Sequence, residues 1–342
     1  MSRPGQPPLA VTMGEPAGIG PDLILMAFAE RASLELPPFV VYGNQAFLAA
    51  RARRLGLDIS FEAVQIGAAA EVFSSALPVV NIEGLVSDNP GDASPLSGKV
   101  VIECIRRAVA ETMTGAARGV VTAPIHKAAL YAAGFKHPGH TEYLAALSAN
   151  KQGTPTPVMM LSRNELRVVP ATVHVPLKDV PRLLTQDLLI RTGKIVARDL
   201  RTRFGIEHPK LAFTGLNPHA GESGTIGMEE LDIIQPAIAE LTFQHIDAVG
   251  PVAADTLFHR PHWRRYDAVI AMYHDQALIP IKTVAFDDAV NVTLGLPFVR
   301  TSPDHGTAFS LAGTGKASTA SFLAALKLAD RLTRGRVPQP AQ

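Results

Sequence analysis

Three histidines of the sequence each follow an apolar, strand-like segment. His174 lies near the end of "LRVVPATVHVPL", His219 follows "KLAFTGLNP", and His274 follows "YDAVIAMY". The carboxyl ends of parallel strands share one edge of a sheet, so these side chains can converge although they are distant in sequence. Neutral imidazoles bind Zn²⁺, Co²⁺ and similar ions, and three protein ligands leave positions open for substrate. The shared placement favours a metal site over three separately hydrogen-bonded loop histidines.

A fourth histidine has nearly the same setting. His126 follows the apolar run "GVVTAP" and precedes a helical pattern. The pattern by itself therefore does not choose three ligands from the four candidates.

A glycine-rich turn follows the first strand-like segment. The stretch "VTMGEPAGIGPDLILMAFAE" places Gly14, Gly18 and Gly20 ahead of a helix that opens at Pro21. Glycine lets a backbone approach a ligand closely, and the N–H groups at a helix N-terminus favour anions. The spacing is not the G-x-G-x-x-G of Rossmann folds, and an isolated glycine turn is more often structural than ligand-binding.

Several polar residues lie in apolar surroundings. The segments "HPGHTEYLAAL", "AADTLF", "ALIPIKTVAF" and "VNVTLGLPFVRTSPDHGTA" contain His140, Thr141, Asp255, Lys282, Asn291, Arg300 and His305. Lysine and arginine are rarely buried without a partner, so Lys282 and Arg300 need anions close by. Internal carboxylates such as Asp255 can supply them, and so can a phosphorylated or carboxylated substrate. The pattern leaves both interpretations open.

The elements that position these residues alternate between short apolar strands and helices. Strand-like runs without polar alternation, separated by helical patterns, occupy residues 9–13, 38–43, 119–124, 210–215 and 266–273. Such strands are buried on both faces, and the helices between them imply parallel pairing. The fold class is therefore α/β. The polar segment 85–98 is either a linker between domains or a surface loop.

Composition limits the class of protein. Of the 342 residues, 47% are hydrophobic and 18% are charged, as in ordinary globular proteins. Lysine plus arginine (32) nearly equals aspartate plus glutamate (31), so no charge excess points to nucleic acid or a membrane surface. A single cysteine, Cys104, excludes a disulfide framework. No apolar stretch approaches the ~18 residues of a membrane span, and no signal-peptide core is found, so we expect a cytoplasmic protein.

Taken in order, the motifs resemble those of one known family. The segments "MGEPAGIGPD", "TAPIHK", "PGHTE", "HVPLKDV", "GLNPHAGE", "ADTLF", "AMYHDQ", "VNVTLGLPFVRTSPDHGTA" and "AGTGKA" follow one another between Leu9 and Leu332. They are similar to the motifs of the 4-hydroxythreonine-4-phosphate dehydrogenases of vitamin B6 (pyridoxal phosphate) biosynthesis. Two of them, "GEPAGIGPD" and "DHGTAFSLAGTGKA", also resemble motifs of the isocitrate and isopropylmalate dehydrogenases.

The resemblance implies an architecture and an assembly. It implies a two-domain α/β fold like that of the isocitrate and isopropylmalate dehydrogenases. The active site would lie in the interdomain cleft at a dimer interface, shared by both chains of a homodimer. A cofactor-side domain would comprise residues 1–120 and 300–342, and a metal, substrate and dimerisation domain residues 121–299.

The resemblance also implies an activity. It implies oxidation of 4-phosphohydroxy-L-threonine by NAD or NADP at the secondary hydroxyl, followed by decarboxylation to 3-amino-2-oxopropyl phosphate. Each site would hold one divalent metal: Zn, Mg or Co. The metal ligands fall on His174, His219 and His274, which sets His126 aside. The substrate contacts fall on His140, Thr141, Lys282, Asn291 and Arg300. Catalytic roles fall on Lys282 and Asp255, and cofactor contacts on Gly14, Gly18, Gly20, His305 and Gly306.

Other functions compete with this interpretation. Similar enzymes oxidise 4-phosphorylated threonate or erythronate, or an aromatic cis-dihydrodiol. A metal-dependent aldolase also uses histidine-bound metal and phosphorylated substrates, but it needs no nicotinamide. The glycine turn and the "HGTA" segment argue against the aldolase, and a non-catalytic binding protein has no evident need for a metal with open positions.

Overall fold

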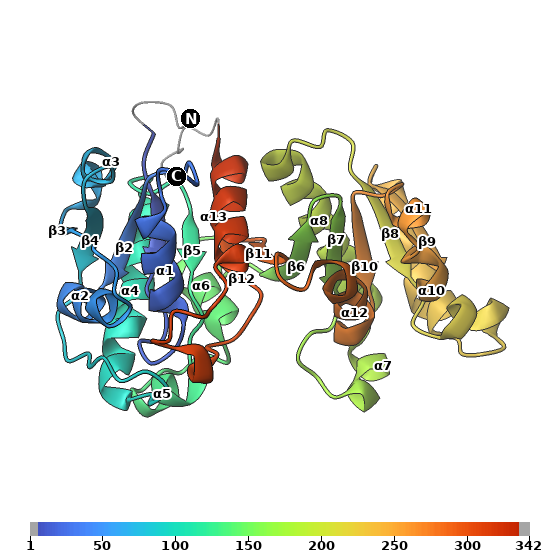
Figure 1. Cartoon of the computed structure of the whole chain (residues 1–342). Helices are drawn as coiled ribbons and strands as arrows, with labels where there is room; N and C mark the ends of the chain where they lie inside the picture. Colours follow the sequence, from blue (N-terminus) through green and yellow to red (C-terminus); the bar gives the residue numbers. More distant parts are fainter. Residues whose placement is uncertain (1–5, 335–342) are drawn as a thin grey trace. The chain divides into compact units, whose positions relative to one another are not determined.

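The computed structural model describes residues 6–334 and divides them into two compact units (Figure 1). The first unit comprises the chain up to Pro157 together with the segment from Leu296 onward, and the second comprises Val158–Gly295. Each unit is built on a sheet with helices packed against it, which confirms the α/β class. Across residues 6–334, no helix combines the length and the apolar character that crossing a membrane would require.

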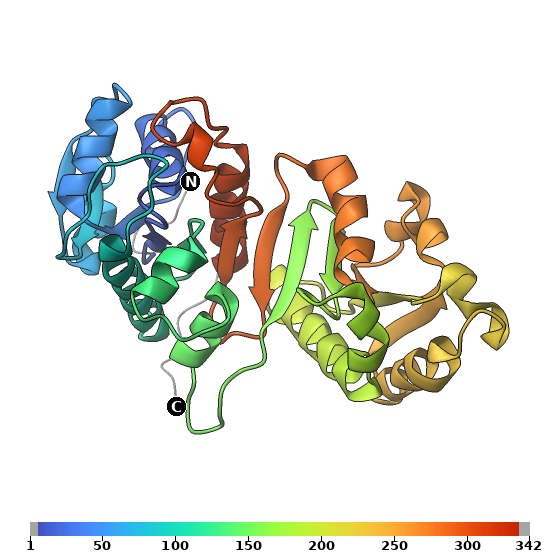
Figure 2. The same cartoon turned by 90° about the horizontal axis from the view of Figure 1, so that it is seen from below.

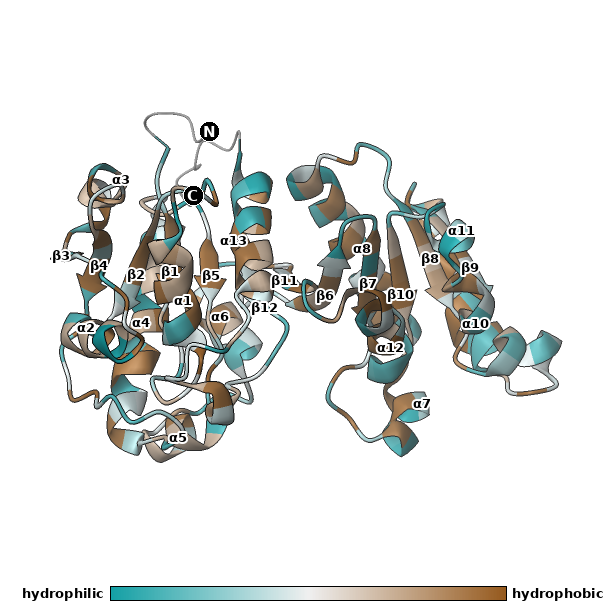
Figure 3. Cartoon of the chain, viewed as in Figure 1, coloured by the Kyte–Doolittle hydropathy of each residue, from teal (hydrophilic) through white to brown (hydrophobic). Residues whose placement is uncertain are grey.

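The strands of the first unit are all parallel to their neighbours. They lie in the order β3-β4-β2-β1-β5-β12. In chain order they are β1 (Leu9–Thr12), β2 (Phe39–Gly43), β3 (Phe61–Ala63), β4 (Leu77–Asn81), β5 (Val120–Thr122) and β12 (Arg300–Pro303). Residues of β1, β2 and β5 are buried without alternation, as expected for strands covered on both faces. Figure 3 shows that these strands are mostly hydrophobic.

The helices of the first unit cover both faces of its sheet (Figure 2). They are α1 (Gly20–Ala29), α2 (Gln45–Arg54), α3 (Ala69–Val72), α4 (Pro95–Met113), α5 (Lys127–Ala132), α6 (His140–Leu147) and α13 (Ala320–Thr333). Helix α4 packs on β1, β2 and β5 and carries α5 and α6 against it, whereas α13 packs on β5 and β12 beside α1. Short 3₁₀ turns lie at η1 (Ile66–Ala68) and η5 (Phe309–Leu311).

The second unit has a mixed sheet, in the order β11-β6-β7-β10-β8-β9. Its strands are β6 (Val158–Arg163), β7 (Leu166–Pro170), β8 (Lys210–Thr214), β9 (Asp247–Val252), β10 (Ala268–Ala271) and β11 (Val290–Leu294). Strands β7, β10, β8 and β9 are parallel, but β6 pairs antiparallel with both β11 and β7. The parallel pairing expected for the segments that became β1, β2, β5, β8 and β10 is confirmed, and β6 lies outside those segments. A turn through Asn164 and Glu165, with Asn164 at φ 50°, joins β6 directly to β7, and so short a connection permits only antiparallel pairing.

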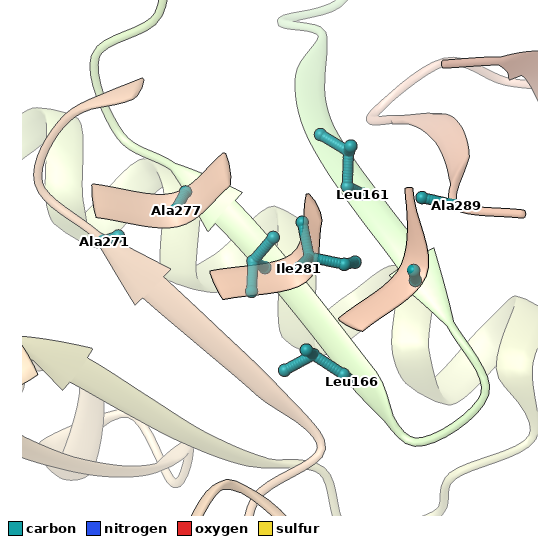
Figure 4. Close-up of a cluster of buried hydrophobic side chains, with 8 residues drawn as sticks. Leu161, Leu166, Ala271, Ala277, Ile281 and Ala289 are labelled. Atoms are coloured by element: carbon teal, nitrogen blue, oxygen red, sulfur yellow. The ribbon is translucent and has the colours of Figure 1, made fainter. Parts of the chain in front are cut away.

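Helices also cover both faces of the second sheet (Figure 2). They are α7 (Val180–Leu183), α8 (Gln186–Phe204), α9 (Gln235–Phe243), α10 (Ala254–Leu257), α11 (Arg260–Trp263) and α12 (His274–Ala285). Further helical turns lie at η2 (Leu177–Asp179), η3 (Pro218–Gly224) and η4 (Glu230–Ile234). Helix α12 packs on β6, β7 and β10. Figure 4 shows Ile281 of α12 among Leu161, Leu166 and Ala277, all of them buried. This apolar contact fixes the helix that begins at His274.

The bounds of the units differ from the expected domain bounds. Residues 121–157 belong to the first unit, because β5 pairs with both β1 and β12 and because α5 and α6 pack against α4. Segment 85–98 lies within the first unit and leads into α4, so it is a surface loop and not a linker. His140 and Thr141 consequently lie in the same unit as Arg300.

Candidate active site

The three candidate metal ligands lie beyond the carboxyl ends of three neighbouring parallel strands. His174 follows β7, His274 follows β10 and His219 follows β8, and the sheet places these strands in the order β7-β10-β8. The ring centroids of His174 and His274 are 5.6 Å apart. Both rings line a pocket of about 280 Å³, together with Asp275 and apolar residues such as Val180. The expected placement of these histidines at strand ends is confirmed.

Hydrogen bonds tie the three strand ends to one another. The hydroxyl of Thr172, beyond β7, donates to the carbonyl of Met272 at 2.8 Å. Gln276 joins the other pair: its Oε1 accepts from Thr214 Oγ1 at 2.7 Å and from Met272 N at 2.8 Å, and its Nε2 donates to Gly215 O at 2.8 Å. These bonds set the spacing of the segments that carry His174, His274 and His219.

The segment that carries His219 has an unusual backbone. Six consecutive residues, 219–224, have positive φ, and only Gly221 and Gly224 are glycines. Left-handed geometry is costly for the other four, so their surroundings must hold them in it. The buried carboxylate of Glu230 accepts hydrogen bonds from Leu216 N and Asn217 N at 2.8 Å each. A Cβ on Gly221 would lie 2.6 Å from Glu230 Oε2, which explains the glycine.

Neighbouring carboxylates orient two of the three imidazoles. His219 Nδ1 lies 2.7 Å from Glu222 Oε1, and His274 Nδ1 lies 2.7 Å from Asp275 Oδ1. A carboxylate only accepts, so each Nδ1 carries the proton and each Nε2 is the nitrogen left for a ligand. This arrangement is usual for metal-binding histidines. The hydrogen bond to Glu222 also raises the pKa of His219. The donor set therefore fits a divalent metal in its chemistry.

The chemistry of these side chains suits a metal ion, but their positions do not bring all three together. Within residues 6–334, no three His, Cys, Asp or Glu side chains form a group that could hold a metal ion. His174 and His274 are close together, but the side chain of His219 is 65% exposed and is held by Glu222. The three-histidine site therefore stays a prediction.

The remaining candidates of the second unit lie on different elements. Asp255 is exposed in the first turn of α10, where its carboxylate accepts from Thr256 N at 2.7 Å. Its negative charge contributes, after Glu222, to the raised pKa of His219. Lys282 is half-buried on α12, with Nζ 5.3 Å from the centroid of the Phe286 ring. Asn291 is half-buried on β11, opposite Leu161 of β6.

The candidate anion-binding residues of the first unit include a buried cation. Arg300 is only 4% exposed, and its guanidinium donates to Thr122 Oγ1 at 2.7 and 3.1 Å. Burial lowers the pKa of Arg300 to about 10, so the side chain stays positively charged at neutral pH. Burial, and then the charge of Arg300, also lower the pKa of His140 well below its usual value. A buried cation therefore lies close to a neutral imidazole.

The start of α6 adds hydrogen-bond donors to this group. His140 and Thr141 are the first residues of the helix, and no side chain caps its N-terminus. The backbone N–H groups of the first turn lack partners within the helix and favour anions. His140 Nε2 is buried and has no hydrogen-bond partner among residues 6–334. The group formed by Arg300, His140 and Thr141 suits a phosphate or a carboxylate.

The glycines expected to bind a cofactor are used in packing. A Cβ on Gly14 would lie 2.6 Å from Pro124 O, one on Gly18 would lie 2.9 Å from Thr307 O, and one on Gly20 would lie 2.9 Å from Ala123 Cβ. Close approach of the protein's own backbone therefore explains these three glycines without a ligand. Gly306 differs, because a Cβ added there would have no neighbouring atom within 4 Å, and His305 Nδ1 lies 3.0 Å from Gly306 O.

A buried ion pair stabilises the glycine-rich turn. Arg51 is fully buried and donates to Asp22 Oδ1 at 2.5 Å, to Pro16 O at 2.7 Å and to Gly18 O at 3.2 Å. The other oxygen of Asp22 accepts from Gly313 N at 2.6 Å. Arg51 and Asp22 thus join the turn to the segment around Gly313.

Comparison with known proteins assigns a family. The family model described as "Pyridoxal phosphate biosynthetic protein PdxA" matches residues 35–329. The chain belongs to this PdxA family. It is 51% identical to a 4-hydroxythreonine-4-phosphate dehydrogenase of Bradyrhizobium diazoefficiens, in an alignment that covers 98% of this chain and 100% of the relative.

Solved structures of the PdxA family and beyond share the fold. A crystal structure of 4-hydroxythreonine-4-phosphate dehydrogenase from Klebsiella pneumoniae matches with a TM-score of 0.85 at 37% identity, covering 97% of this chain and 100% of that one. A terephthalate 1,2-cis-dihydrodiol dehydrogenase from Burkholderia xenovorans matches with a TM-score of 0.65 at 28% identity, covering 95% and 98%.

Sequence reasoning missed the residues that support the candidate site of this PdxA-family chain. Glu222, Asp275 and Gln276 each lie within three residues of a candidate metal ligand. A polar neighbour so close to a histidine was a usable signal for Glu222 and Asp275. The role of Gln276 depends on β8, which is adjacent only in space, so no local pattern could have found it.

Proposed function

We propose that this chain is a 4-hydroxythreonine-4-phosphate dehydrogenase. It oxidises 4-phosphohydroxy-L-threonine with NAD or NADP at the secondary hydroxyl, and the product loses CO₂ to give 3-amino-2-oxopropyl phosphate. The observation that carries the proposal is the meeting of His174 and His274 beyond adjacent strands, with His219 beyond the next. The relatives named above are dehydrogenases, which favours oxidation over the carbon–carbon cleavage of a metal-dependent aldolase.

His174, His219 and His274 would hold one divalent metal ion (Zn, Mg or Co) through nitrogen atoms. When bound, the metal supplies Lewis acidity, which lowers the pKa of the substrate hydroxyl and stabilises negative charge during decarboxylation. Asp275 and Glu222 keep the Nδ1 proton of their histidines and so present Nε2. Gln276 and Thr172 maintain the distances between the segments that carry the ligands.

The anionic groups of the substrate would be bound by a separate set of residues. Arg300 can offer the planar fork of its guanidinium to a phosphate or carboxylate, with His140 and Thr141 beside it. Lys282 would act as a point charge or as a proton-transfer group, Asn291 as a hydrogen-bonding residue, and Asp255 as a base or a partner of the substrate ammonium. These roles rest on residue type and on the family resemblance.

The architecture of the functional enzyme extends the proposal. We assign the chain the arrangement of the isocitrate and isopropylmalate dehydrogenases: a cofactor-side unit, a metal-side unit and an active site in the cleft, shared by two chains of a homodimer. The division of the candidate residues supports it. His140, Thr141 and Arg300 lie in one unit, and the three histidines, Asp255, Lys282 and Asn291 lie in the other. NAD or NADP would be held near His305, Gly306 and the glycine-rich turn.

One experiment tests the proposed function directly. The purified protein is supplied with 4-phosphohydroxy-L-threonine and NAD or NADP, and formation of reduced cofactor is followed by absorbance, with and without chelator. We expect turnover that chelation removes and added metal restores. The same assay with 4-phospho-erythronate and with a terephthalate cis-dihydrodiol separates the rivals within the family. A larger kcat/KM with either rival substrate, or no reduced cofactor at all, would overturn the proposal.

A further inference from the structure

Buried polar atoms without hydrogen-bond partners gather at one edge of the first unit. Among residues 6–334 they include Thr12 Oγ1, Glu15 Oε2, His126 Nδ1 and His305 Nε2. Thr12 ends β1 and Glu15 follows it, His126 follows β5, and His305 follows β12. These strands are adjacent and parallel, so the four atoms belong to the carboxyl edge of one sheet. Buried polar atoms are nearly always paired, so such a group marks a place where a polar ligand binds.

Glu15 is the charged member of this group. It is 1% exposed, and the backbone on either side of it is fixed by bonds from Glu15 N to Pro124 O at 2.8 Å and from Gly18 N to Glu15 O at 3.0 Å. One carboxylate oxygen accepts from Ala17 N at 3.1 Å, whereas the other has no donor among residues 6–334. Burial raises the pKa of Glu15. A buried carboxylate with one oxygen unused is costly unless something donates to it.

His126 is the histidine that the metal assignment sets aside. Its ring stands edge-on to Phe309, with centroids 5.1 Å apart and an interplanar angle of 84°. Its segment is bonded to that of Glu15, because Glu15 N donates to Pro124 O at 2.8 Å, two residues before His126. Nδ1 is buried and unused, so the imidazole can donate to or accept from the same ligand as Glu15.

We propose that Glu15 and His126 form the part of the cofactor site that binds the nicotinamide half of the dinucleotide. The unused oxygen of Glu15 accepts a hydrogen bond from the carboxamide NH₂ of the nicotinamide, and His126 bonds to the same carboxamide group. This inference rests on the proposed function, because it presumes that a nicotinamide cofactor is used. It assigns roles to two residues that the family resemblance left without one.

Charge and connectivity both favour the cofactor over the substrate as the ligand of Glu15 and His126. The proposed substrate carries a phosphate and a carboxylate besides its ammonium group, so a buried carboxylate would repel two of its three charged groups, whereas the nicotinamide carboxamide offers neutral N–H donors. The loop that contains Glu15 is also bonded to the segment around His305, since Ile19 N donates to Thr307 O at 2.9 Å. That segment and the glycine-rich turn are the ones expected to meet the cofactor.

Binding of NADH to the full-length protein, without substrate, tests the assignment. Affinity is measured by nicotinamide fluorescence for the wild type, Glu15→Gln and His126→Asn. The exposed glutamate variant Glu71→Gln is the matched control. ADP-ribose, which lacks the nicotinamide ring, is the second probe and is measured by competition or calorimetry. Glutamine keeps an oxygen for Ala17 N, so Glu15→Gln preserves the loop, and His126→Asn probes a different segment in case one variant does not fold.

We expect each variant to lose at least about tenfold in NADH affinity, because a hydrogen bond to a charged group is lost or weakened. ADP-ribose affinity should be unchanged within about twofold, and Glu71→Gln should match the wild type. Folded variants that bind NADH like the wild type would overturn the inference. So would variants whose affinity for ADP-ribose falls as much as their affinity for NADH. A wild-type protein that binds no NADH and no NADPH would instead count against the proposed function.

Discussion

Gln276 accepts a hydrogen bond from the hydroxyl of Thr214 at 2.7 Å, which joins the start of α12 to the end of β8. The same amide oxygen also accepts from Met272 N at 2.8 Å, and the amide nitrogen donates to Gly215 O at 2.8 Å. All three partners lie on the strand ends that lead to His219 and His274. Both polar atoms of one side chain are therefore used to fix the separation of two candidate metal ligands.

Replacing Gln276 by methionine should weaken metal binding more than it harms folding. The variant keeps the volume of the side chain but leaves buried strand-end groups unpaired, which we expect to cost about 1–3 kcal/mol of stability. Loss of a residue that orients metal ligands typically costs about 10–100-fold in metal affinity. Affinity is measured by competition with a chromophoric chelator, and stability by thermal unfolding. The exposed Gln65→Met variant is the control, and an unchanged metal affinity in Gln276→Met would remove its positioning role.

His219→Ala should abolish bound metal and nearly all turnover while leaving the fold intact. The side chain is 65% exposed, so its removal costs little packing. Metal content is determined by emission spectrometry, and circular dichroism monitors the fold. His208→Ala, another exposed histidine of the same unit, should keep its metal. A full complement of metal in His219→Ala would refute its assignment as a ligand.

Arg300→Lys should lower kcat/KM without changing metal content. Lysine keeps the charge but loses the planar fork, so a bidentate contact with a phosphate or carboxylate is reduced to a single contact. One charge-assisted hydrogen bond is worth ~1.5–3 kcal/mol, which corresponds to a fall of at least about tenfold. Steady-state kinetics and metal analysis on the same preparation check this. Wild-type kinetics in Arg300→Lys would indicate that Arg300 does not bind the substrate and has only a structural role beside Thr122.

A mixture of two inactive variants should recover activity if each site draws on both chains of a dimer. His274→Ala impairs the metal side, and His140→Asn impairs the anion side in the other unit. In a statistical mixture half of the dimers are mixed, and each of these has one undamaged site, so about a quarter of wild-type activity is expected. Mixing His274→Ala with His174→Ala should recover no activity. Both rings belong to the metal side of the same chain, with centroids 5.6 Å apart, so every metal site would lack one of them. No recovery with the first pair, despite proven subunit exchange, would place the site within one chain.

Arg51→Met should destabilise the protein without acting on the substrate directly. It leaves Asp22 buried without its ion-pair partner and frees two carbonyls of the glycine-rich turn. Breaking a buried pair from one side costs about 3–5 kcal/mol. Urea unfolding measures the loss, with the exposed Arg53→Met on the same helix as control. A loss below about 1 kcal/mol would show that the pair contributes little.

The sequence by itself determined the class of the fold and the placement of the histidines. Runs such as "KLAFTG" and "YDAVIAMY" are apolar on both faces, so they could only become buried strands, and His219 and His274 had to lie beyond them. These features depend on a few consecutive residues, and local patterns record them directly. The family motifs were equally local, and the match over residues 35–329 confirms what they indicated.

Only the tertiary structure decided which of these residues become neighbours. The order β7-β10-β8 brings His174 beside His274, and no pattern within either segment specifies the strand that will lie next to it. The pattern of the N-terminal glycine turn favoured a structural role without saying what the glycines pack against, and the structure shows that they make room for Ala123, Pro124 and Thr307. Gln276 and Glu15 gain their importance from atoms far away in the chain. Contacts of this kind depend on packing between distant segments, which a reading of local sequence does not contain.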